Sequence, residues 1–269
     1  MTDQQRYLRG SIDTHCHITS MIEKGLDALG LLAEIRSHGM AAVVDVGLTP
    51  DDLSDRETLL SDFPLVALTS GIHPSRADRD DLTALVDQLS DQVAAGRIVA
   101  VGELGLDYHW DTGERGVQQW LLDEQLALAA GSDLPVIIHN READDDIRAA
   151  LQRLRPRGVM HCFSQGLAFC RVCLDLGMYI SFGGNLTYKR SEEIREAARF
   201  VPADRLLVET DSPYLSPLPV RGRPNHPGHL GFTIDALAEL RGHDAQALAE
   251  QTAQNARALF ERNSAEEGA

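Results

Sequence analysis

Short apolar runs alternate along the chain with longer amphipathic segments. Eight runs rich in Val, Ile, Leu and Ala are predicted as strands, and most are continuously apolar, as strands buried on both faces are. They cover residues 11–17, 41–48, 65–74, 97–107, 135–140, 158–163, 178–184 and 206–213. Helical patterns such as LTALVDQLSDQVAAG and VQQWLLDEQLALAAG lie between them. The alternation therefore predicts parallel strands joined by helices.

The number of alternations indicates the architecture. Eight strand–helix units in about 250 residues have the size of a (β/α)8 barrel, so we expect an α/β fold with one TIM-type domain over residues 1–262. A doubly wound open sheet is the alternative. No GxGxxG motif follows the first strand, which argues against a dinucleotide-binding version of that sheet. Residues 263–269 are expected to form a frayed tail.

Composition narrows the class of protein. The chain has 269 residues, of which 43% are hydrophobic, enough to bury a full core. It lacks the run of about 18 apolar residues that a membrane helix needs, and its first residues lack the apolar stretch of a secretory signal. Four cysteines are too few for a disulfide scaffold at this length. We expect a cytoplasmic protein without a membrane partner, and a monomer.

The charge restricts how a nucleic acid could be held. The net charge is −16, and Lys24 and Lys189 are the only two lysines. A protein that binds nucleic acid through bulk charge should be basic. Any nucleic-acid substrate would therefore be held locally, by metal ions and a few arginines, while the acidic surface as a whole is best explained as solvated.

Candidate chemistry gathers where the predicted strands end, which is where barrel enzymes carry their active sites. The first strand ends in DTHCH, in which His15 and His17 are two residues apart and so project to the same side. The later strand ends add His73, Glu103, His139, His161 and Asp211. Imidazole nitrogens combined with carboxylates are typical ligands of divalent metal ions.

These residues predict a metal centre. Six candidate ligands, namely His15, His17, Glu103, His139, His161 and Asp211, exceed the three or so protein ligands of a single open catalytic site. We therefore expect two divalent ions, Mg, Mn or Zn, with Glu103 as the bridge, because strand four lies between the two groups of ligands. The alternatives are a packed core histidine at each strand position, a structural ion pair at Glu103, and a simple turn at GIHP.

An ordered set of motifs carries a family resemblance. The motifs are DTHCH, GIHP, VGELGLDYHW, PVIIHNREA, HCFS, YISFGG, LLVETDSPYLSP, RGRPNHP and NARALF. On these motifs the chain resembles the TatD family of metal-dependent deoxyribonucleases, within the amidohydrolase-like barrels, from DTHCH to about Phe260.

The resemblance implies roles for individual residues. One ion would be held by His15, His17, Glu103 and Asp211, and the second by Glu103, His139 and His161. His73 and Arg141 would meet a substrate phosphate. The chain departs from the family pattern at Gln165, which precedes Gly166 in the HCFS motif, and at His226, which replaces a glutamate. His226 could then be a surface residue or a phosphate contact.

The function predicted from these features is metal-dependent phosphodiester hydrolysis. Two ions can clamp the attacking and leaving oxygens and activate a water, and Asp211 could take the proton of that water. Arg141 and Arg221 would hold backbone phosphates, and Tyr108 and Trp110 could stack on a base. The resemblance suggests a 3′–5′ exonuclease acting on single-stranded DNA, with RNA as a further candidate substrate.

Two other functions stay open. The first is hydrolysis of another ester or amide, such as D-aminoacyl-tRNA. Many binuclear amidohydrolases bridge their ions with a carbamylated lysine, and neither lysine stands at a suitable strand end here, which argues against lactonases but not against tRNA deacylation. The second is a non-catalytic metal-binding scaffold, against which the open ligand set argues.

Overall fold

The computed structural model describes residues 5–110 and 112–261. Within these residues eight parallel strands alternate with ten α-helices. The strands are β1 (Ile12–Cys16), β2 (Ala42–Asp45), β3 (Val66–Leu68), β4 (Val101–Asp107), β5 (Val136–Arg141), β6 (Gly158–Met160), β7 (Tyr179–Phe182) and β8 (Leu206–Val208). The helices are α1 (Ile18–Glu23), α2 (Ala28–Ser37), α3 (Leu53–Leu59), α4 (Leu82–Ala94), α5 (Arg115–Gly131), α6 (Asp144–Leu154), α7 (Leu167–Asp175), α8 (Glu192–Phe200), α9 (Leu230–Arg241) and α10 (Ala245–Phe260).

The strands close into a ring. β1–β2–β3 and β4–β5–β6–β7–β8 each pair in sequence order, and isolated parallel bridges join the two sets at Ser70–Val101 and Cys16–Ser212. Across the second junction the Asp211 N–H donates to the His15 carbonyl at 2.9 Å. The predicted (β/α)8 barrel is therefore confirmed.

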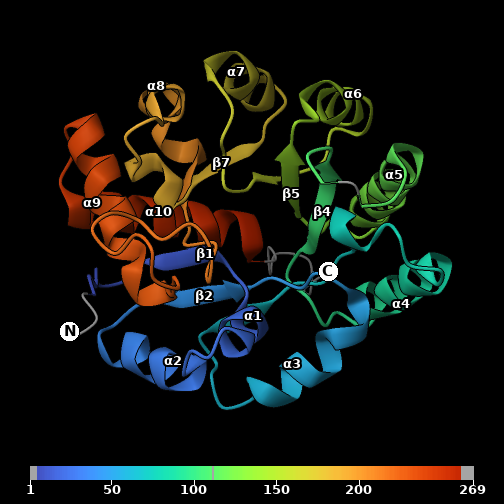
Figure 1. Cartoon of the computed structure of the whole chain (residues 1–269), viewed down its shortest axis with the longest axis horizontal. Coiled ribbons are helices and arrows are strands. Elements are labelled where there is room, and N and C mark those ends of the chain that lie inside the picture. Colours follow the sequence, from blue (N-terminus) through green and yellow to red (C-terminus); the bar gives the residue numbers. More distant parts are fainter. Residues whose placement is uncertain (1–4, 111, 262–269) are drawn as a thin grey trace, which may run out of the picture.

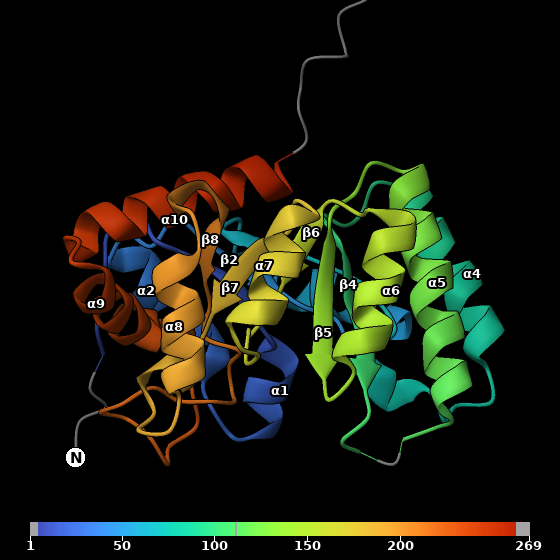
Figure 2. The same cartoon turned by 90° about the horizontal axis from the view of Figure 1, so that it is seen from above.

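The helices surround the ring and α10 closes one end of it. Figure 1 shows α2 to α9 arranged around the strands. Figure 2 shows α10 across one end and α1 at the other, toward which the β5 arrow points. Ala253 and Leu259 of α10 pack in one core cluster with Ile137 and Leu207 of the strands. The amino end of the barrel is thus sealed by apolar packing, and the carboxyl end is left for chemistry.

Strand alternation decides which side chains face the barrel interior. In β5, Val136 and Ile138 belong to the larger core cluster, while Ile137 packs in the cluster that includes α10. His139 has the parity of Ile137, so it points inward. The neighbouring strand approaches closely: a Cβ on Gly105, whose φ is +147°, would lie 2.0 Å from the His139 carbonyl oxygen. Glycine at this position lets β4 and β5 pair directly beside the candidate ligands.

Several predicted strands are longer than the observed ones. The run at 65–74 forms a strand only over Val66–Leu68, and the run at 206–213 only over Leu206–Val208. The chain leaves the hydrogen-bonded ladder before His73 and before Asp211, which adopts φ 55°. These departures place both side chains in the mouth of the barrel instead of along its wall.

Other expectations stay predictions. The domain bounds 1–262, the monomeric state and the cytoplasmic location are not tested by the fold, and the expected tail at 263–269 lies outside the described residues. In the described part of the chain, no helix is long and apolar enough to cross a membrane.

Candidate metal centre

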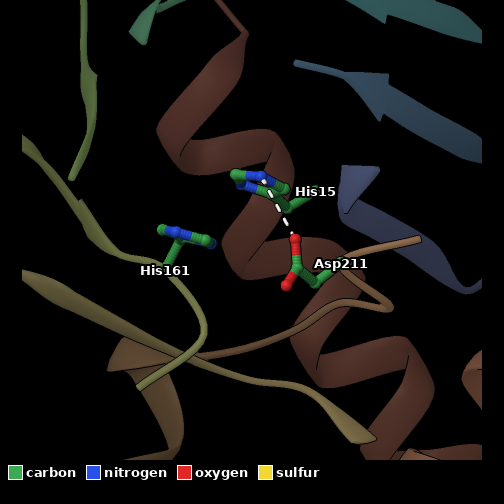
Figure 3. A group of neighbouring side chains, drawn as sticks. All are labelled: His15, His161 and Asp211. Atoms are coloured by element: carbon green, nitrogen blue, oxygen red, sulfur yellow. Dashed lines mark ion pairs between the residues drawn. The ribbon is translucent and has the colours of Figure 1, made fainter. Parts of the chain in front are cut away.

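The six predicted ligands meet at the carboxyl end of the barrel, although they come from five different strands or the turns after them. His15 lies in β1, Glu103 in β4 and His139 in β5. His17 and His161 directly follow β1 and β6, and Asp211 lies in the turn after β8. Figure 3 shows His15, His161 and Asp211 pointing toward one another, with the His15 Nε2 atom 3.8 Å from Asp211 Oδ1. The two imidazole rings stack with centroids 4.0 Å apart.

Glu103 lies in the middle of the cluster and is 3% exposed. Its Oε1 atom is 2.8 Å from His161 Nε2, 3.0 Å from His139 Nδ1 and 3.5 Å from His73 Nε2. This carboxylate oxygen therefore faces the three histidines that lie in or after β3, β5 and β6.

The second oxygen of Glu103 faces a different group. Its Oε2 atom is 3.5 Å from His15 Nε2 and 3.6 Å from His17 Nε2, and His17 Nε2 is also 3.6 Å from Asp211 Oδ1. The carboxylate thus lies between two sets of ligand atoms, which is the position that a bridging ligand requires.

The donor set fits divalent metal ions. Ligand atoms of three groups lie within 4.8 Å of one another: His15–His161–Asp211, His15–His17–Glu103 and His73–Glu103–His139. His15 Nε2 and His17 Nε2 are only 3.1 Å apart. Two nitrogens bound to one ion at about 2.1 Å are separated by about 3.0 Å in octahedral and about 3.4 Å in tetrahedral geometry, so this spacing suits two ligands of the same ion.

Hydrogen bonds behind the ligands fix which imidazole nitrogen is free. The Val46 carbonyl, 2.8 Å from His17 Nδ1, can only accept, so His17 carries a proton on Nδ1 and turns the lone pair of Nε2 toward the cluster. Glu209 Oε1 does the same for His161 Nδ1 at 3.2 Å. A carboxylate or carbonyl behind a histidine is typical of metal ligands.

Asp107 orients His139 from the other side of its ring. The Asp107 Oδ2 atom lies 3.2 Å from His139 Nε2, which leaves Nδ1 to face the cluster. Asp107 also accepts the backbone N–H of His109 at 3.0 Å and of Trp110 at 3.3 Å. The same carboxylate therefore connects a candidate ligand to the loop that carries Trp110.

His73 has the opposite proton arrangement. Its Nδ1 atom accepts the Ser75 backbone N–H at 3.0 Å, so the neutral ring carries its proton on Nε2, which points at Glu103. Burial lowers the pKa of His73 to about 3, which keeps the ring neutral. This tautomer favours donation of a hydrogen bond to a substrate oxygen over metal ligation.

Glu103 and His161 each stabilise the charged form of the other. Burial alone would raise the pKa of Glu103, but the neighbouring His161, together with hydrogen bonds from His139 and His15, holds it well below the usual range. Burial likewise opposes protonation of His161, while Glu103 and Glu209 raise its pKa well above the usual value. The carboxylate is therefore ionised, and positive charge is favoured beside it.

A buried ion pair supports the start of α1 next to His17. Asp45 accepts the Ile18 N–H at 2.8 Å and pairs with Arg56 at 3.1 Å. Arg56 is 3% exposed and also donates to the Thr69 carbonyl at 2.7 Å. The pair thus connects β2, the end of β3 and the start of α1 next to the candidate ligand His17.

The candidate substrate residues lie at the rim and are more exposed than the ligands. The Arg141 guanidinium is 5.4 Å from the centre of the Trp110 ring, and the Arg221 guanidinium is 4.1 Å from the centre of the Tyr188 ring. Tyr108 is half-buried, and its hydroxyl donates to Asp146 at 2.7 Å. A cavity of about 910 Å³, which none of the six candidate ligands lines, is bounded by Tyr108, Arg115, Arg141, Glu142, Ala143, Asp144, Asp145, Asp146, Ser164 and Gln165.

The two departures from the family pattern have different surroundings. Gln165 lines this cavity and donates to the Asn140 carbonyl at 2.9 Å. His226 is fully buried and packs against the His229 ring, with centroids 3.7 Å apart. The expectation that His226 is a surface residue or a phosphate contact was therefore wrong, because the loop after β8 folds it into the protein.

Sequence reasoning missed Asp107 and Glu209. Both carry a signal in the strand period, since Asp107 has the parity of Glu103 in β4 and Glu209 precedes Asp211 by two residues. Glu209 lies inside its predicted strand, and Asp107 closes the predicted run 97–107, but only their contacts with His161 and His139 reveal their roles.

Comparison with known proteins agrees with the site. The family model described as TatD related DNase matches residues 12–261. The uncharacterized metal-dependent hydrolase YabD of Bacillus subtilis is 33% identical over 258 residues, which cover 93% of this chain and 99% of the relative. The uncharacterized metal-dependent hydrolase TatD of Mycobacterium tuberculosis is 36% identical over 267 residues, covering 93% and 97%.

A solved structure has the same architecture. The crystal structure of YJJV, a TatD homolog from Escherichia coli, superposes with a TM-score of 0.86 at 32% identity, and the match covers 94% of this chain and 98% of that one.

Proposed function

Because the chain belongs to the TatD family and is a metal-dependent hydrolase, we propose that it hydrolyses the phosphodiester bonds of single-stranded DNA as a 3′–5′ exonuclease. The observation that carries this proposal is the position of Glu103 between two sets of ligand atoms. That arrangement suits a pair of ions, the usual device for in-line displacement at phosphorus.

The ligand residues would divide between two ions. His15, His17, Glu103 and Asp211 would hold the first, and Glu103, His139 and His161 the second. When bound, such ions supply positive charge that polarises a phosphoryl oxygen and acidifies a water.

The chain itself would bind the phosphate and move the proton. His73, with its proton on Nε2, would donate to a phosphate oxygen beside Glu103. Arg141 and Arg221 at the rim would bind neighbouring phosphates. Asp211 is 9% exposed. Burial by itself would raise its pKa, but the neighbouring His17, His15 and His161 outweigh this effect and lower the pKa. An ionised carboxylate at this position can accept the proton of the attacking water.

The test is digestion of single-stranded DNA labelled at either end, with Mg²⁺, Mn²⁺, Zn²⁺ or EDTA. We expect metal-dependent loss of nucleotides from the 3′ end, and none from the Glu103→Ala protein. The exposed carboxylate Glu250 lies on α10, which closes the other end of the barrel, and gives a matched control, Glu250→Gln, that should stay active. Deacylation of D-aminoacyl-tRNA without cleavage of DNA would overturn the proposal.

A further inference from the structure

An exposed tyrosine stands beside the ligand His17. The Tyr214 side chain lies in the turn after β8 and is 42% exposed. Its ring meets the His17 ring edge to face, with centroids 6.2 Å apart. The Lys24 ammonium, at the end of α1, lies 4.0 Å from the centre of the Tyr214 ring. One of the two lysines of a chain with net charge −16 is therefore placed at the edge of the metal centre.

The position of Tyr214 is fixed by its backbone. Its N–H donates to the Asp211 carbonyl at 2.8 Å, and its own carbonyl accepts the Asn225 side-chain amide at 2.8 Å. The same amide donates to the Thr210 carbonyl at 2.8 Å, and Asn225 is fully buried. The backbone that carries the ring is thus held in a constant relation to Asp211, while 42% of the side chain is exposed to solvent.

A similar pair stands on another side of the cluster. Trp110 is 61% exposed, Arg141 lies over it, and its loop is tied by Asp107 to His139. Tyr214 and Lys24 adjoin His17, whereas Trp110 and Arg141 adjoin His139. Aromatic faces combined with cations are the usual means of holding single-stranded nucleic acid, because every base has a face that stacks and every nucleotide a phosphate.

We propose that Tyr214 and Lys24 form a nucleotide subsite on the His17 side of the metal centre, where the Tyr214 ring stacks on one base and Lys24 contacts the phosphate of the same nucleotide. This inference rests on the proposed nuclease function. It assigns one nucleotide of the strand to a defined pair of residues, and it leaves Trp110 and Arg141 to hold the strand on the His139 side.

The test removes the ring and the base separately. Single-stranded oligonucleotides that lack one base at successive positions from the cleaved end are digested by the wild type and by Tyr214→Ala. For the wild type, we expect one position at which loss of the base raises KM about 5- to 150-fold, the range of a base–aromatic stack. For Tyr214→Ala that penalty should fall to within about twofold, because the stacking partner is already gone.

Further variants separate stacking from a structural role. Tyr214→Phe keeps the ring and should restore the penalty. Phe200→Ala is the matched control, since Phe200 is 43% exposed with the Arg171 guanidinium 4.6 Å from its ring centre, but it ends α8, at the opposite end of the barrel. Lys24→Gln should reduce the slope of log KM against log salt by about 0.7, the value for one phosphate contact on a single strand.

The outcomes distinguish the two proposals. An equal penalty for the missing base in wild type and Tyr214→Ala, at every position, would overturn the subsite while leaving the nuclease intact. Loss of metal binding by Tyr214→Ala in calorimetry would also overturn it, because the ring would then serve the ligands and not the substrate. A wild-type protein that degrades no intact oligonucleotide with any ion would overturn the nuclease proposal itself.

Discussion

The bridging position of Glu103 gives a quantitative prediction for Glu103→Gln. This change keeps the shape of the side chain and removes one negative charge from between two sets of ligands, whose nitrogens lie 2.8–3.6 Å from its oxygens. One unit charge about 4 Å from another, at an effective dielectric constant of about 20, contributes about 4 kcal/mol. Each divalent ion should therefore bind at least about three orders of magnitude more weakly.

Calorimetric titration of Mn²⁺ or Zn²⁺ into chelator-treated protein measures this loss directly. We expect two ions per wild-type chain, and unchanged far-ultraviolet circular dichroism for Glu103→Gln because the substitution is isosteric. Glu250→Gln removes an exposed carboxylate on α10 and should bind metal as the wild type does. Retention of wild-type affinity for both ions by Glu103→Gln would refute the bridging assignment, whatever the activity of the variant.

Two further predictions concern residues that act from behind the ligands. Glu209→Gln removes the charge that orients His161, so metal affinity in the same titration should fall about 10- to 100-fold, and an unchanged affinity would contradict this role. Arg56→Ala leaves the carboxylate of Asp45 buried without its partner and should lower the free energy of unfolding in urea by about 3–5 kcal/mol. Arg79, whose side chain is 31% exposed and pairs with Asp81 and Asp51, is the control, since its replacement by alanine should cost at most about 1 kcal/mol. Equal effects of the two changes would show that burial of the Arg56 pair is unimportant.

The sequence by itself determined the architecture and the chemical type of the site. Eight apolar runs at regular intervals specify a barrel, because strand and helix periods are local properties of the chain. The spacing of His15 and His17 places both imidazoles on one side of a strand for the same reason. The ligands could be found because barrel chemistry is confined to one end of each strand.

The sequence could not reveal contacts that depend on ring closure. Cys16 and Ser212 pair although most of the chain separates them in sequence, and this junction brings Asp211 beside His15. No local pattern indicates that Lys24 lies over Tyr214, or that His226 is buried behind the loop after β8.

The tertiary structure alone decided the proton arrangement of the site. All the histidines have the same two nitrogens, and hydrogen-bond partners distant in sequence determine which one is free. Glu209 and Asp107 turn a lone pair of His161 and of His139 toward the cluster, whereas Ser75 turns an N–H of His73 toward it. Residue types fix what a site can bind, but the choice between ligand and donor depends on neighbours that only the folded chain brings together.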